Sequence, residues 1–384
     1  MKCCFRYFFF VSLCFSFGCS QTGTEKKYAE KAEELDWKNT KYARGFRIGY
    51  GKGFKLITVA DPWKNKDQKF QYLLYREEKD IPAGFEKAMK VKLPVKTMAV
   101  LSSLYVAYVE KLDLYDHLTG VSEFRHISSE KAKAMIRAGK LVEVGSNGNV
   151  NIEKLITLHP DLVITYGSNV SSDDSHPKLQ EAGLKVAVNI EQMENTPLGR
   201  AEWIKFMAAF FDKEKEADSL FNSIESDYFK VREEALKAKT RPSAYVGIRY
   251  GDIWYMPGGN SYAANLLKDA NAWYLWEDNK ERGSQHLSFE EVYQKASEAD
   301  YWINTGEWKT IADVLKADVR YGNFKAVKTG MVYNNNNRLN EFGGNDYWES
   351  GIVHPHLVLS DLIKIVHPEL LPGYKLVYYK KLEH

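Results

Sequence analysis

Two alternating patterns of apolar and polar positions run along most of the chain. Short apolar runs bounded by turn residues predict strands, for example at Lys55–Ala60, Phe70–Arg76 and Lys96–Leu101. Segments between such runs have the periodicity of amphipathic helices, as at Leu104–Leu112 and Ser128–Ala138. Because strands and helices alternate, the pattern predicts an α/β fold with parallel or mixed sheets.

The longest uninterrupted pattern lies in the middle of the chain, where no Gly or Pro occurs between Gly199 and Pro242. Apolar residues fall on one helical face there, at Ala217, Leu220, Phe221, Ile224, Tyr228, Val231 and Ala235. We expect one helix over Lys213–Lys239, roughly 40 Å long. A coiled-coil seam of this length would be short. Since the α/β alternation resumes after Pro242, a stiff helix joining two lobes fits better.

A similar motif occurs once on each side of this helix. The segment "NIEKLITLHPDLVITYG" (Asn151–Gly167) reads as a helical turn, a Pro-Asp stop and a buried strand, and "SFEEVYQKASEADYWINTG" (Ser288–Gly306) follows the same order. Glu153 and Glu290 stand near the start of the two copies, and Glu291 is an alternative in the second. Each glutamate either interacts with its own helix dipole or forms one half of a two-point charged surface for a partner.

All four cysteines, Cys3, Cys4, Cys14 and Cys19, lie in the first nineteen residues. Lys2 and Arg6 precede a short apolar run that ends at Gly18-Cys19, which is typical of an export signal. The position of Cys19 resembles a bacterial lipobox, although Ser16 stands where Leu is usual; plain secretion is the alternative. We expect a signal peptide at 1–19, acylation of Cys19 and a flexible or weakly helical tether at 20–41. The cysteine-free remainder excludes a disulfide framework and a catalytic thiol.

The charge balance and the motifs exclude several functions. The 384 residues contain 53 basic and 51 acidic side chains, which argues against a nucleic-acid partner. Phosphate-loop, G-x-S-x-G and H-E-x-x-H motifs do not occur, and we expect no enzyme. His354-Pro355-His356 is a weak metal signal and is interpreted as the start of a helix.

Together these features resemble a known family, the helical-backbone periplasmic substrate-binding proteins of ABC importers, which carry ferric siderophores, haem or cobalamin. The resemblance covers roughly Tyr42 to Leu382. It implies an α/β fold with two Rossmann-like lobes (42–212 and 240–384), joined by one long rigid helix (213–239), with a ligand cleft between them. It also implies that Glu153 and Glu290 dock onto arginines of the membrane permease.

The resemblance places the ligand at loops that follow the strands. The expected contacts are Ser103, Asn147, Tyr166, Arg249, Trp254, Tyr255, Tyr262, Trp308, Arg338 and Trp348. Arginine can bind carboxylate or catecholate oxygens, and Trp and Tyr offer apolar faces with a polar tip. Alternation within Arg249–Met256 means that Tyr250, Trp254 and Met256 cannot all face the cleft. Cobalamin binders of this family carry a Trp before each docking Glu, and this chain does not.

The expected protein is therefore a monomeric lipoprotein in the periplasm of a Gram-negative bacterium. It would capture a small-molecule metal chelate, most simply a ferric siderophore, and deliver it to an inner-membrane ABC permease. It would touch the membrane only through its lipid and need no cofactor or metal of its own. Two alternatives stay open: a cobalamin or haem binder of the same class, and an envelope enzyme on this scaffold.

Overall fold

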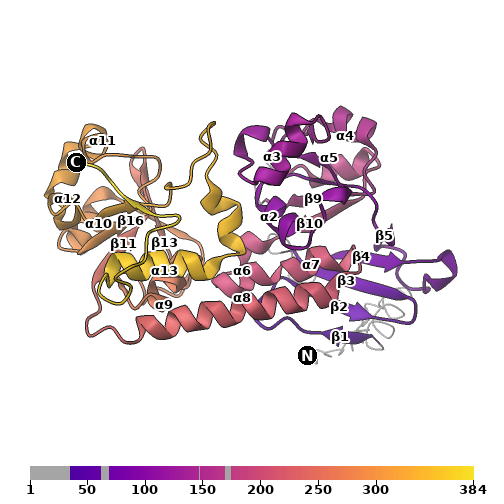
Figure 1. Cartoon of the computed structure of the whole chain (residues 1–384), viewed down its shortest axis with the longest axis horizontal. Helices are drawn as coiled ribbons and strands as arrows, with labels where there is room; N and C mark the ends of the chain where they lie inside the picture. The colour runs from indigo at the N-terminus through magenta and orange to yellow at the C-terminus, as the bar shows by residue number, and fades with distance from the viewer. Residues whose placement is uncertain (1–34, 62–68, 147, 169–173) are drawn as a thin grey trace, which may run out of the picture.

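The computed structural model describes residues 35–61, 69–146, 148–168 and 174–384, and these form two α/β lobes side by side (Figure 1). Each lobe has its own central sheet, and helix α8 (Glu214–Ala235) runs along both. The predicted fold class, two α/β lobes joined by one long helix, is confirmed. The lobes are called the N-lobe and the C-lobe below.

The N-lobe is built on a parallel sheet with strand order β10-β9-β6-β7-β8. Its strands are β6 (Met98–Val100), β7 (Leu118–Val121), β8 (Val142–Glu143), β9 (Leu162–Tyr166) and β10 (Val186–Asn189). Its helices are α2 (Leu104–Lys111), α3 (Glu130–Arg137), α4 (Ile152–Leu158) and α5 (His176–Glu181). Strand β7 ends at Val121, and a 3-10 helix, η3 (Phe124–His126), follows.

The C-lobe sheet has the order β14-β11-β16-β17-β18, and only β18 is antiparallel. Its strands are β11 (Ser243–Val246), β14 (Trp273–Tyr274), β16 (Tyr301–Ile303), β17 (Val332–Asn334) and β18 (Lys380–Lys381). Its helices are α9 (Tyr262–Asp269), α10 (Phe289–Ala296), α11 (Ile311–Ala317) and α12 (Lys325–Lys328). A separate antiparallel sheet contains β12 (Arg249–Tyr250), β13 (Ile253–Pro257) and β15 (Ser284–Leu287).

The chain leaves the main C-lobe sheet at Gly247, directly after β11. Gly247 has a φ of 95°, which side chains disfavour. A Cβ at this position would lie 2.5 Å from the carbonyl oxygen of Tyr255. The strand therefore breaks here, and Arg249 is carried into the small sheet.

An additional sheet, called sheet A here, precedes the N-lobe. It contains β1 (Asp36–Lys38), β2 (Phe46–Tyr50), β3 (Phe54–Ala60), β4 (Lys69–Tyr75) and β5 (Met89–Lys92). All neighbouring pairs are antiparallel except β4–β5. The strand pair predicted at 55–60 and 70–76 is confirmed. The tether expected to reach residue 41 ends earlier, because β1 pairs with β2.

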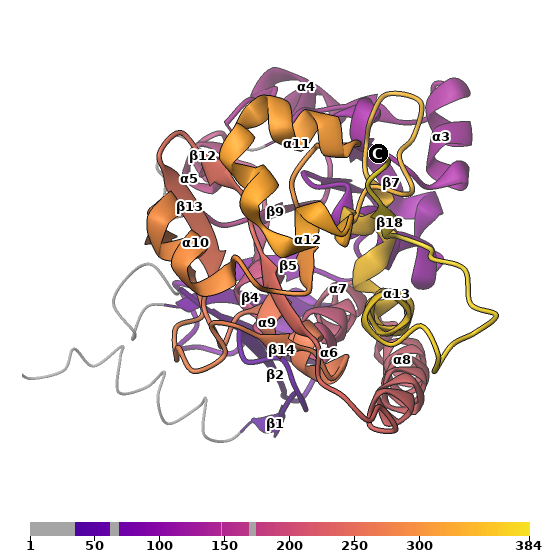
Figure 2. The ribbon, with the colours of Figure 1, turned by 90° about the vertical axis from the view of Figure 1, so that its left-hand side faces the viewer.

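Helix α8 is part of a layer of helices that supports both lobes. Its 22 residues give a length of roughly 33 Å, and it ends four residues before the expected Lys239. The predicted apolar face is confirmed, since Ala217, Phe221, Ile224, Tyr228 and Ala235 are buried. Helices α6 (Pro197–Glu202), α7 (Ile204–Ala209) and α13 (Pro355–Val366) pack against α8. Figure 2 shows α8 and α13 side by side.

The helix entry predicted at His354–His356 is confirmed, with His354 as the N-cap of α13 and Pro355 as its first residue. The remaining 3-10 helices are η1 (Glu78–Asp80), η2 (Tyr115–His117), η4 (Glu191–Met193), η5 (Val319–Asn323), η6 (Asp346–Trp348) and η7 (Ser350–Ile352). Among the described residues, none of the helices has the length and apolarity needed to cross a bilayer.

Candidate functional site

The two copies of the repeated motif form equivalent helix starts. In α4 the N-cap Asn151 accepts a hydrogen bond from the first helical turn at 2.9 Å. In α10 the N-cap Ser288 accepts from the Glu291 N–H at 3.2 Å, and the Glu291 carboxylate accepts from the Ser288 N–H at 2.7 Å. Glu153 and Glu290 therefore occupy the same place, the second residue after the cap. Since Glu291 is engaged in the cap, Glu290 is the counterpart of Glu153.

The surroundings of these two exposed glutamates differ. Glu290 forms an ion pair with Arg320 at 3.2 Å, and Arg320 also pairs with Asp318 at 2.8 Å. Hydrogen bonds from Arg320 lower the pKa of Asp318 to about 2. Within the described chain no ion pair involves Glu153. The C-lobe glutamate is therefore already partly neutralised, whereas its N-lobe counterpart is not.

The strand after each motif copy is fixed in the same way in both lobes. Asp161 accepts hydrogen bonds from the N–H groups of Lys96 and Thr97 at 2.9 and 3.0 Å, and its own N–H donates to the Thr97 hydroxyl at 3.0 Å. Asp300 accepts from the Ser243 N–H and hydroxyl at 2.9 and 2.7 Å, and its N–H donates to that hydroxyl at 3.0 Å. The repeat in the sequence thus encodes a repeated junction between adjacent parallel strands.

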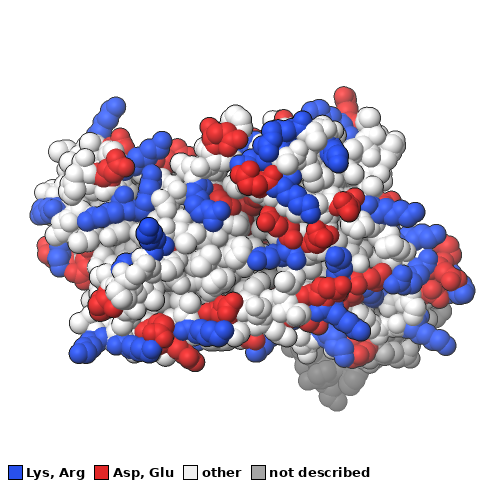
Figure 3. Space-filling model, viewed as in Figure 1, with Lys and Arg blue, Asp and Glu red and all other residues white. Residues whose placement is uncertain are grey.

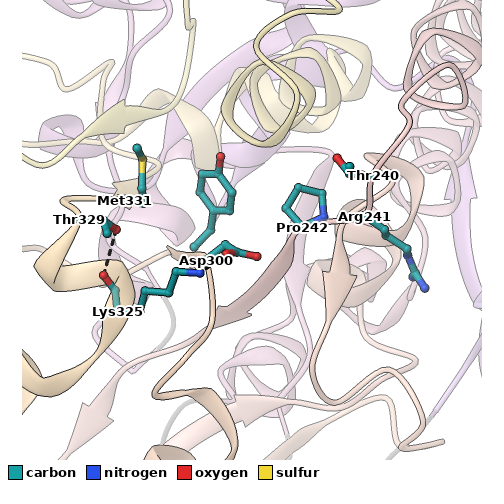
Figure 4. A pocket seen from close by; sticks show the side chains of 8 residues that line it. Thr240, Arg241, Pro242, Asp300, Lys325, Thr329 and Met331 are labelled. Atoms are coloured by element: carbon teal, nitrogen blue, oxygen red, sulfur yellow. Dashed lines mark hydrogen bonds and ion pairs between the residues drawn. The ribbon is translucent and has the colours of Figure 1, made fainter.

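The C-lobe junction borders a surface depression of about 540 Å³ (Figure 4). Lys325 lines it and pairs with Asp300 at 2.7 Å. Burial raises the pKa of Asp300, but the hydrogen bonds from Lys325 and Ser243 outweigh this effect and lower it. Because the depression lies at the amino ends of the strands, it is separate from the site at their carboxyl ends. Ligands of open α/β sheets bind at the carboxyl ends.

Side chains near the carboxyl ends of the strands connect the two lobes. The Arg200 guanidinium of α6 lies 4.0 Å from the ring centroid of Tyr262, the first residue of α9. The side chain of Asn195 donates a hydrogen bond to that of Asn260 at 2.8 Å, and Asn265 donates to the Asn195 carbonyl at 2.8 Å. These contacts fix the start of α9 against the N-lobe.

Three tyrosines extend this connection into the C-lobe. The side chains of Tyr262, Tyr347 and Tyr379 interact in series, and Tyr379 continues to Asn304, which directly follows β16. Burial raises the pKa of all three tyrosines. Their hydroxyls are therefore neutral hydrogen-bonding groups at physiological pH.

A buried carboxyl group, Glu191 in η4, lies on the N-lobe side of the connection. Its side chain is 4% exposed, and its carboxylate accepts from the Gln192 N–H at 2.7 Å. Burial raises the pKa of Glu191 to about 7, although the nearby Arg200 opposes the rise. It interacts electrostatically with Tyr105 and Tyr108 of α2. This region can therefore hold a proton near neutral pH.

Several buried polar atoms beside this connection have no hydrogen-bond partner in the protein. They are Tyr105 Oη, Asn189 Nδ2 and Gln192 Oε1 in the N-lobe, and Asn304 Oδ1, Thr305 Oγ1 and Asn336 Oδ1 in the C-lobe. Each belongs to a residue at, or shortly after, the carboxyl end of a parallel strand. An unpaired buried polar group costs about 1–3 kcal/mol. Six of the eleven such atoms among the described residues lie at these strand ends, and we take the strand ends of both lobes as the candidate ligand site.

A bridging loop, residues 335–349, leads from the C-lobe to the N-lobe and stands between the two in Figure 1. The Asn340 side chain donates to the carbonyls of Arg125 and Ile127, both at 2.9 Å. A Cβ at Gly344 would lie 2.5 Å from the Arg125 carbonyl oxygen, so only glycine permits this approach. The loop is thus seated on the residues that precede α3.

The last residue of the bridging loop, Glu349, completes this contact. Its carboxylate accepts hydrogen bonds from the N–H groups of Ser128 and Ser129, both at 2.7 Å, and is 2% exposed. Burial raises the pKa of Glu349 to about 8, against the effect of these two hydrogen bonds. Glu349 therefore ties the C-lobe to the start of α3.

The two arginines expected to bind an anionic ligand already have carboxylate partners. Arg249 pairs with Asp318 at 2.8 Å and is 16% exposed. Arg338 pairs with Asp346 at 2.9 Å. A ligand would have to compete with these carboxylates. The contact roles of Arg249 and Arg338 stay predictions.

The expected contact by Trp254 is wrong, because its side chain is fully buried in the C-lobe core against Tyr245 and Trp302. Alternation along β13 turns Trp254 inward and Tyr255 outward, where Tyr255 packs on His286 at 4.9 Å. Trp308 packs edge-on against Trp302 at 5.8 Å. These side chains support the C-lobe rather than the connection between lobes.

Other predicted residues do lie near the connection. Ser103 precedes α2, Tyr166 ends β9 and interacts with Tyr105, and Tyr262 stacks on Arg200. Trp348, in the bridging loop, is 54% exposed and lies edge-on to Tyr347 at 4.7 Å. Asn147 and Cys19 lie outside the described residues.

Sequence reasoning missed the central residues of the connection: Tyr105, Glu191, Arg200, Tyr347 and Glu349. Tyr105 lies among the apolar positions of α2, and its sequence context is that of an ordinary core residue. A signal for Arg200 was present, because the Thr196 hydroxyl caps α6 by accepting from the Gly199 N–H at 3.0 Å. That Thr-Pro start would have placed Arg200 in the first turns of a helix.

A family model described as "Periplasmic binding protein" matches residues 98–339. The match spans more than half of the 384 residues, and the chain belongs to this family. The resemblance to the helical-backbone substrate-binding proteins of ABC importers is confirmed. Sheet A lies outside the matched residues.

Among individual proteins, the chain is similar to an uncharacterized lipoprotein of Methanocaldococcus jannaschii, with 28% identity over 369 residues, 89% of this chain and 84% of the relative. It is also similar to the Fe(3+)-citrate-binding protein of Bacillus subtilis, with 24% identity over 54% of this chain and 65% of the relative. Among solved structures, Helicobacter pylori CeuE in a nickel–histidine complex has a TM-score of 0.57 at 17% identity, covering 83% of this chain and 91% of that one. The structural likeness concerns the fold alone.

Proposed function

We propose that this protein captures an iron complex of the ferric-siderophore type between its lobes and delivers it to an ABC permease. The observation that carries the proposal is the group of unpaired buried polar atoms at the strand ends of both lobes. A chelate rich in carbonyl and hydroxyl oxygens would supply partners for them, and each pairing would remove a cost of about 1–3 kcal/mol. Neighbouring aromatic rings, including Tyr166 and Trp348, offer apolar faces for its remaining surface.

The charge of the site favours an uncharged complex. The unpaired atoms are neutral donors and acceptors, the tyrosines are neutral, and Arg249 and Arg338 are engaged by carboxylates. The positive charge of Arg200 is offset by its electrostatic interaction with the carboxyl group of Glu191. A ferric hydroxamate has these properties, whereas ferric catecholates and ferric citrate carry negative charge. The ferric-citrate binder among the relatives makes ferric citrate the main competitor.

Delivery would use the equivalent glutamates, Glu153 and Glu290. A rigid body with two separated carboxylates can fix the orientation of a cationic partner and accelerate the encounter. Relatives named as lipoproteins support acylation of Cys19 and an extracytoplasmic position on a membrane. The protein would act as a monomer on this tether.

The test is a tryptophan-fluorescence titration of the chain from Ser20 onward with ferric hydroxamate, ferric catecholate, ferric citrate, haem and cobalamin. The ferric hydroxamate should bind most tightly, and its iron-free form should bind at least tenfold more weakly because its oxygens are not held in place. Tightest binding of haem or cobalamin would assign the alternative ligand. No binding of any iron complex would refute the proposal.

A pair of tyrosine variants locates the ligand. Tyr105→Phe removes an unpaired hydroxyl at the proposed site, and Tyr245→Phe removes an unpaired hydroxyl in the C-lobe core. Removal of an unpaired buried hydroxyl should leave stability nearly unchanged in both. Tyr105→Phe should weaken ligand binding about fivefold to tenfold, and Tyr245→Phe should not change it. Equal effects of the two variants would place the ligand elsewhere.

A further inference from the structure

Sheet A contains a surface depression of about 520 Å³ whose charged lining residues, among those that the structure describes, are all basic. Arg44, Arg47 and Lys69 line it together with neutral residues that include Thr40 and Thr58, and none of the described lining residues is acidic. All three cationic residues are exposed. Among the residues that the structure describes, none of their side chains pairs with a carboxylate. On the face that Figure 3 shows, by contrast, acidic and basic side chains are interspersed over both lobes.

The backbone that carries Arg44 is held in place by a buried carboxylate. The buried carboxylate of Glu194 accepts from the N–H groups of Arg44 and Gly45 at 2.7 and 2.8 Å and from the Trp203 indole at 3.1 Å. Oε1 of Glu194 therefore fixes the backbone of Arg44 and Gly45 from the buried side. The Arg44 side chain is left to point to the surface.

The second arginine is held in place by neutral neighbours. The Arg47 guanidinium lies 3.9 Å from the centroid of the Trp37 ring, and its Nε donates to the Thr58 hydroxyl at 3.3 Å. Stacking fixes the plane of the guanidinium and leaves its other N–H groups available. A fixed planar guanidinium is suited to two-point binding of phosphate oxygens.

An adjacent depression of about 420 Å³ shows that this charge pattern is specific. Lys38 and Lys205 line it, but so do Glu214 and Asp218, and Lys205 pairs with Asp218 at 3.0 Å. The two depressions share the neutral residues Asn39, Thr40 and Phe46. Counting the lining residues that the structure describes, only the first depression has an excess of positive charge.

The position of the basic depression indicates where its ligand comes from. Leu35, the first described residue, lies sixteen positions after the expected acylation site, Cys19. Whatever conformation these residues adopt, they span at most about 55 Å. Sheet A can therefore reach the surface of the membrane that carries the anchor, and cannot move further from it than this distance. Anionic bilayers also attract basic groups, with an effect that is lost within a Debye length of the surface.

We propose that this depression binds the phosphate of an anionic lipid headgroup in the membrane that carries the anchor. Figures 1 and 2 both show sheet A and helix α4 at opposite ends of the N-terminal half. A molecule held on headgroups through sheet A therefore presents Glu153 away from the membrane. Headgroup binding and permease docking then exclude each other, and the headgroup-bound molecule is a resting state. The lipid contact itself requires neither the proposed solute nor the proposed docking.

The test is flotation of the chain from Ser20 onward, which keeps every described residue, with vesicles that contain phosphatidylglycerol or only phosphatidylcholine. The variant Arg44→Ala/Arg47→Ala/Lys69→Ala removes the three cations. The control Lys140→Ala/Lys185→Ala/Lys309→Ala makes the same change in net charge at exposed lysines elsewhere. We expect binding to phosphatidylglycerol vesicles that weakens roughly a hundredfold in the first variant and about threefold or less in the control. Neutral vesicles should not bind.

Each other outcome is decisive. Equal loss in both triple variants would show an effect of net charge and overturn the site, as would no binding by the unmodified chain. Calorimetric binding of soluble glycerol phosphate that depends on the three cations, without vesicle binding, would assign a free phosphate and overturn the lipid. Lys69→Glu alone, which leaves the Arg47–Trp37 stack intact, should still weaken vesicle binding; this separates loss of binding from loss of folding. Iron-complex titrations of the same variants should be unchanged, so failure here and failure of the proposed function are distinguishable.

Discussion

The N-lobe and the C-lobe use the same backbone devices but different charges. A capped helix with a glutamate in its second position, and an aspartate bonded to the start of the neighbouring strand, occur in both. In the C-lobe, Arg320 and Lys325 add ion pairs to Glu290 and Asp300. Among the described residues, Glu153 and Asp161 have no such partners. The two lobes therefore share the hydrogen bonds that fix the backbone of the repeated motif, and differ in the charges placed around it.

The largest expected effect is a difference in the free energy of unfolding between the loss of a buried and the loss of an exposed aromatic side chain of the C-lobe. Trp254→Ala should lower the free energy of unfolding by about 3–5 kcal/mol, because it empties a fully buried site. Trp348→Ala, at a side chain that is 54% exposed, should lower it by less than about 0.5 kcal/mol. Urea unfolding of both variants checks this. Similar values would mean that the C-lobe core is not centred on Trp254.

The next effect concerns the residue that joins the lobes. Glu349→Ala leaves the N–H groups of Ser128 and Ser129 without their acceptor and should cost about 2–5 kcal/mol. Because burial raises the pKa of Glu349 to about 8, the folded protein binds its proton more tightly than the unfolded chain does. Its contribution should be complete below its ordinary pKa of 4.5 and decline as pH rises through about 8.

Unfolding measured across this pH range checks the sign of the Glu349 effect. Glu349→Gln carries no ionisable proton and should remove this part of the pH dependence, while it keeps an acceptor for one N–H group. A stability that rises between pH 5 and 8 in the unmodified protein, and does not in Glu349→Gln, would show that the ionised form is the favoured one.

A smaller effect compares the two strand junctions directly. Asp300→Ala should cost about 2–3 kcal/mol and Asp161→Ala about 1–2 kcal/mol, because only Asp300 has a lysine partner as well. The lowered pKa of Asp300 means that its contribution is present above its ordinary value of 3.8 and lost as pH falls through the lower, folded value. Thermal unfolding from pH 2 to 7 measures this. Lys325→Ala should make Asp300 resemble Asp161; an unchanged difference would contradict the comparison.

The smallest expected effects concern the two glutamates at the helix starts. With the partner permease in a cell-based uptake assay, Glu153→Gln should slow uptake about tenfold and Glu290→Gln about threefold, because Arg320 already offsets the charge of Glu290. In an Arg320→Ala background, Glu290→Gln should slow uptake as much as Glu153→Gln does. Solute affinity should be unchanged in each variant. Equal losses that do not depend on Arg320 would remove the asymmetry.

The parts of the fold that depend on local hydrophobic periodicity could be predicted from the sequence. The parts that depend on contacts between segments distant in the sequence could not. The apolar stripe of α8 and the strand–helix alternation follow from local pattern. The break at Gly247 depends on the Tyr255 carbonyl, which lies in another strand. The alternation along β13 was recognised, but the face of Trp254 depends on which sheet carries that strand.

For the site, residues in loops with unusual composition were easier to predict than residues on helices. Tyr262 and Trp348 lie in conspicuous Tyr- and Asn-rich segments. Tyr105 and Arg200 lie on helices whose sequences look like ordinary core and surface, and only the packing of α6 against α9 brings Arg200 onto Tyr262. The equivalence of Glu153 and Glu290 could be inferred from the repeat, but the choice against Glu291 required the cap to be seen.

The packing of α13 along α8 has a consequence for how an importer could recognise a loaded carrier. Two helices packed along their length resist bending more than a single helix does. Empty and occupied molecules would then have nearly the same outline. The transporter would then have to recognise the bound solute itself, at the edge of the cleft between the lobes, rather than a change in the shape of the protein. Some binding of the solute-free protein to the transporter should therefore be expected.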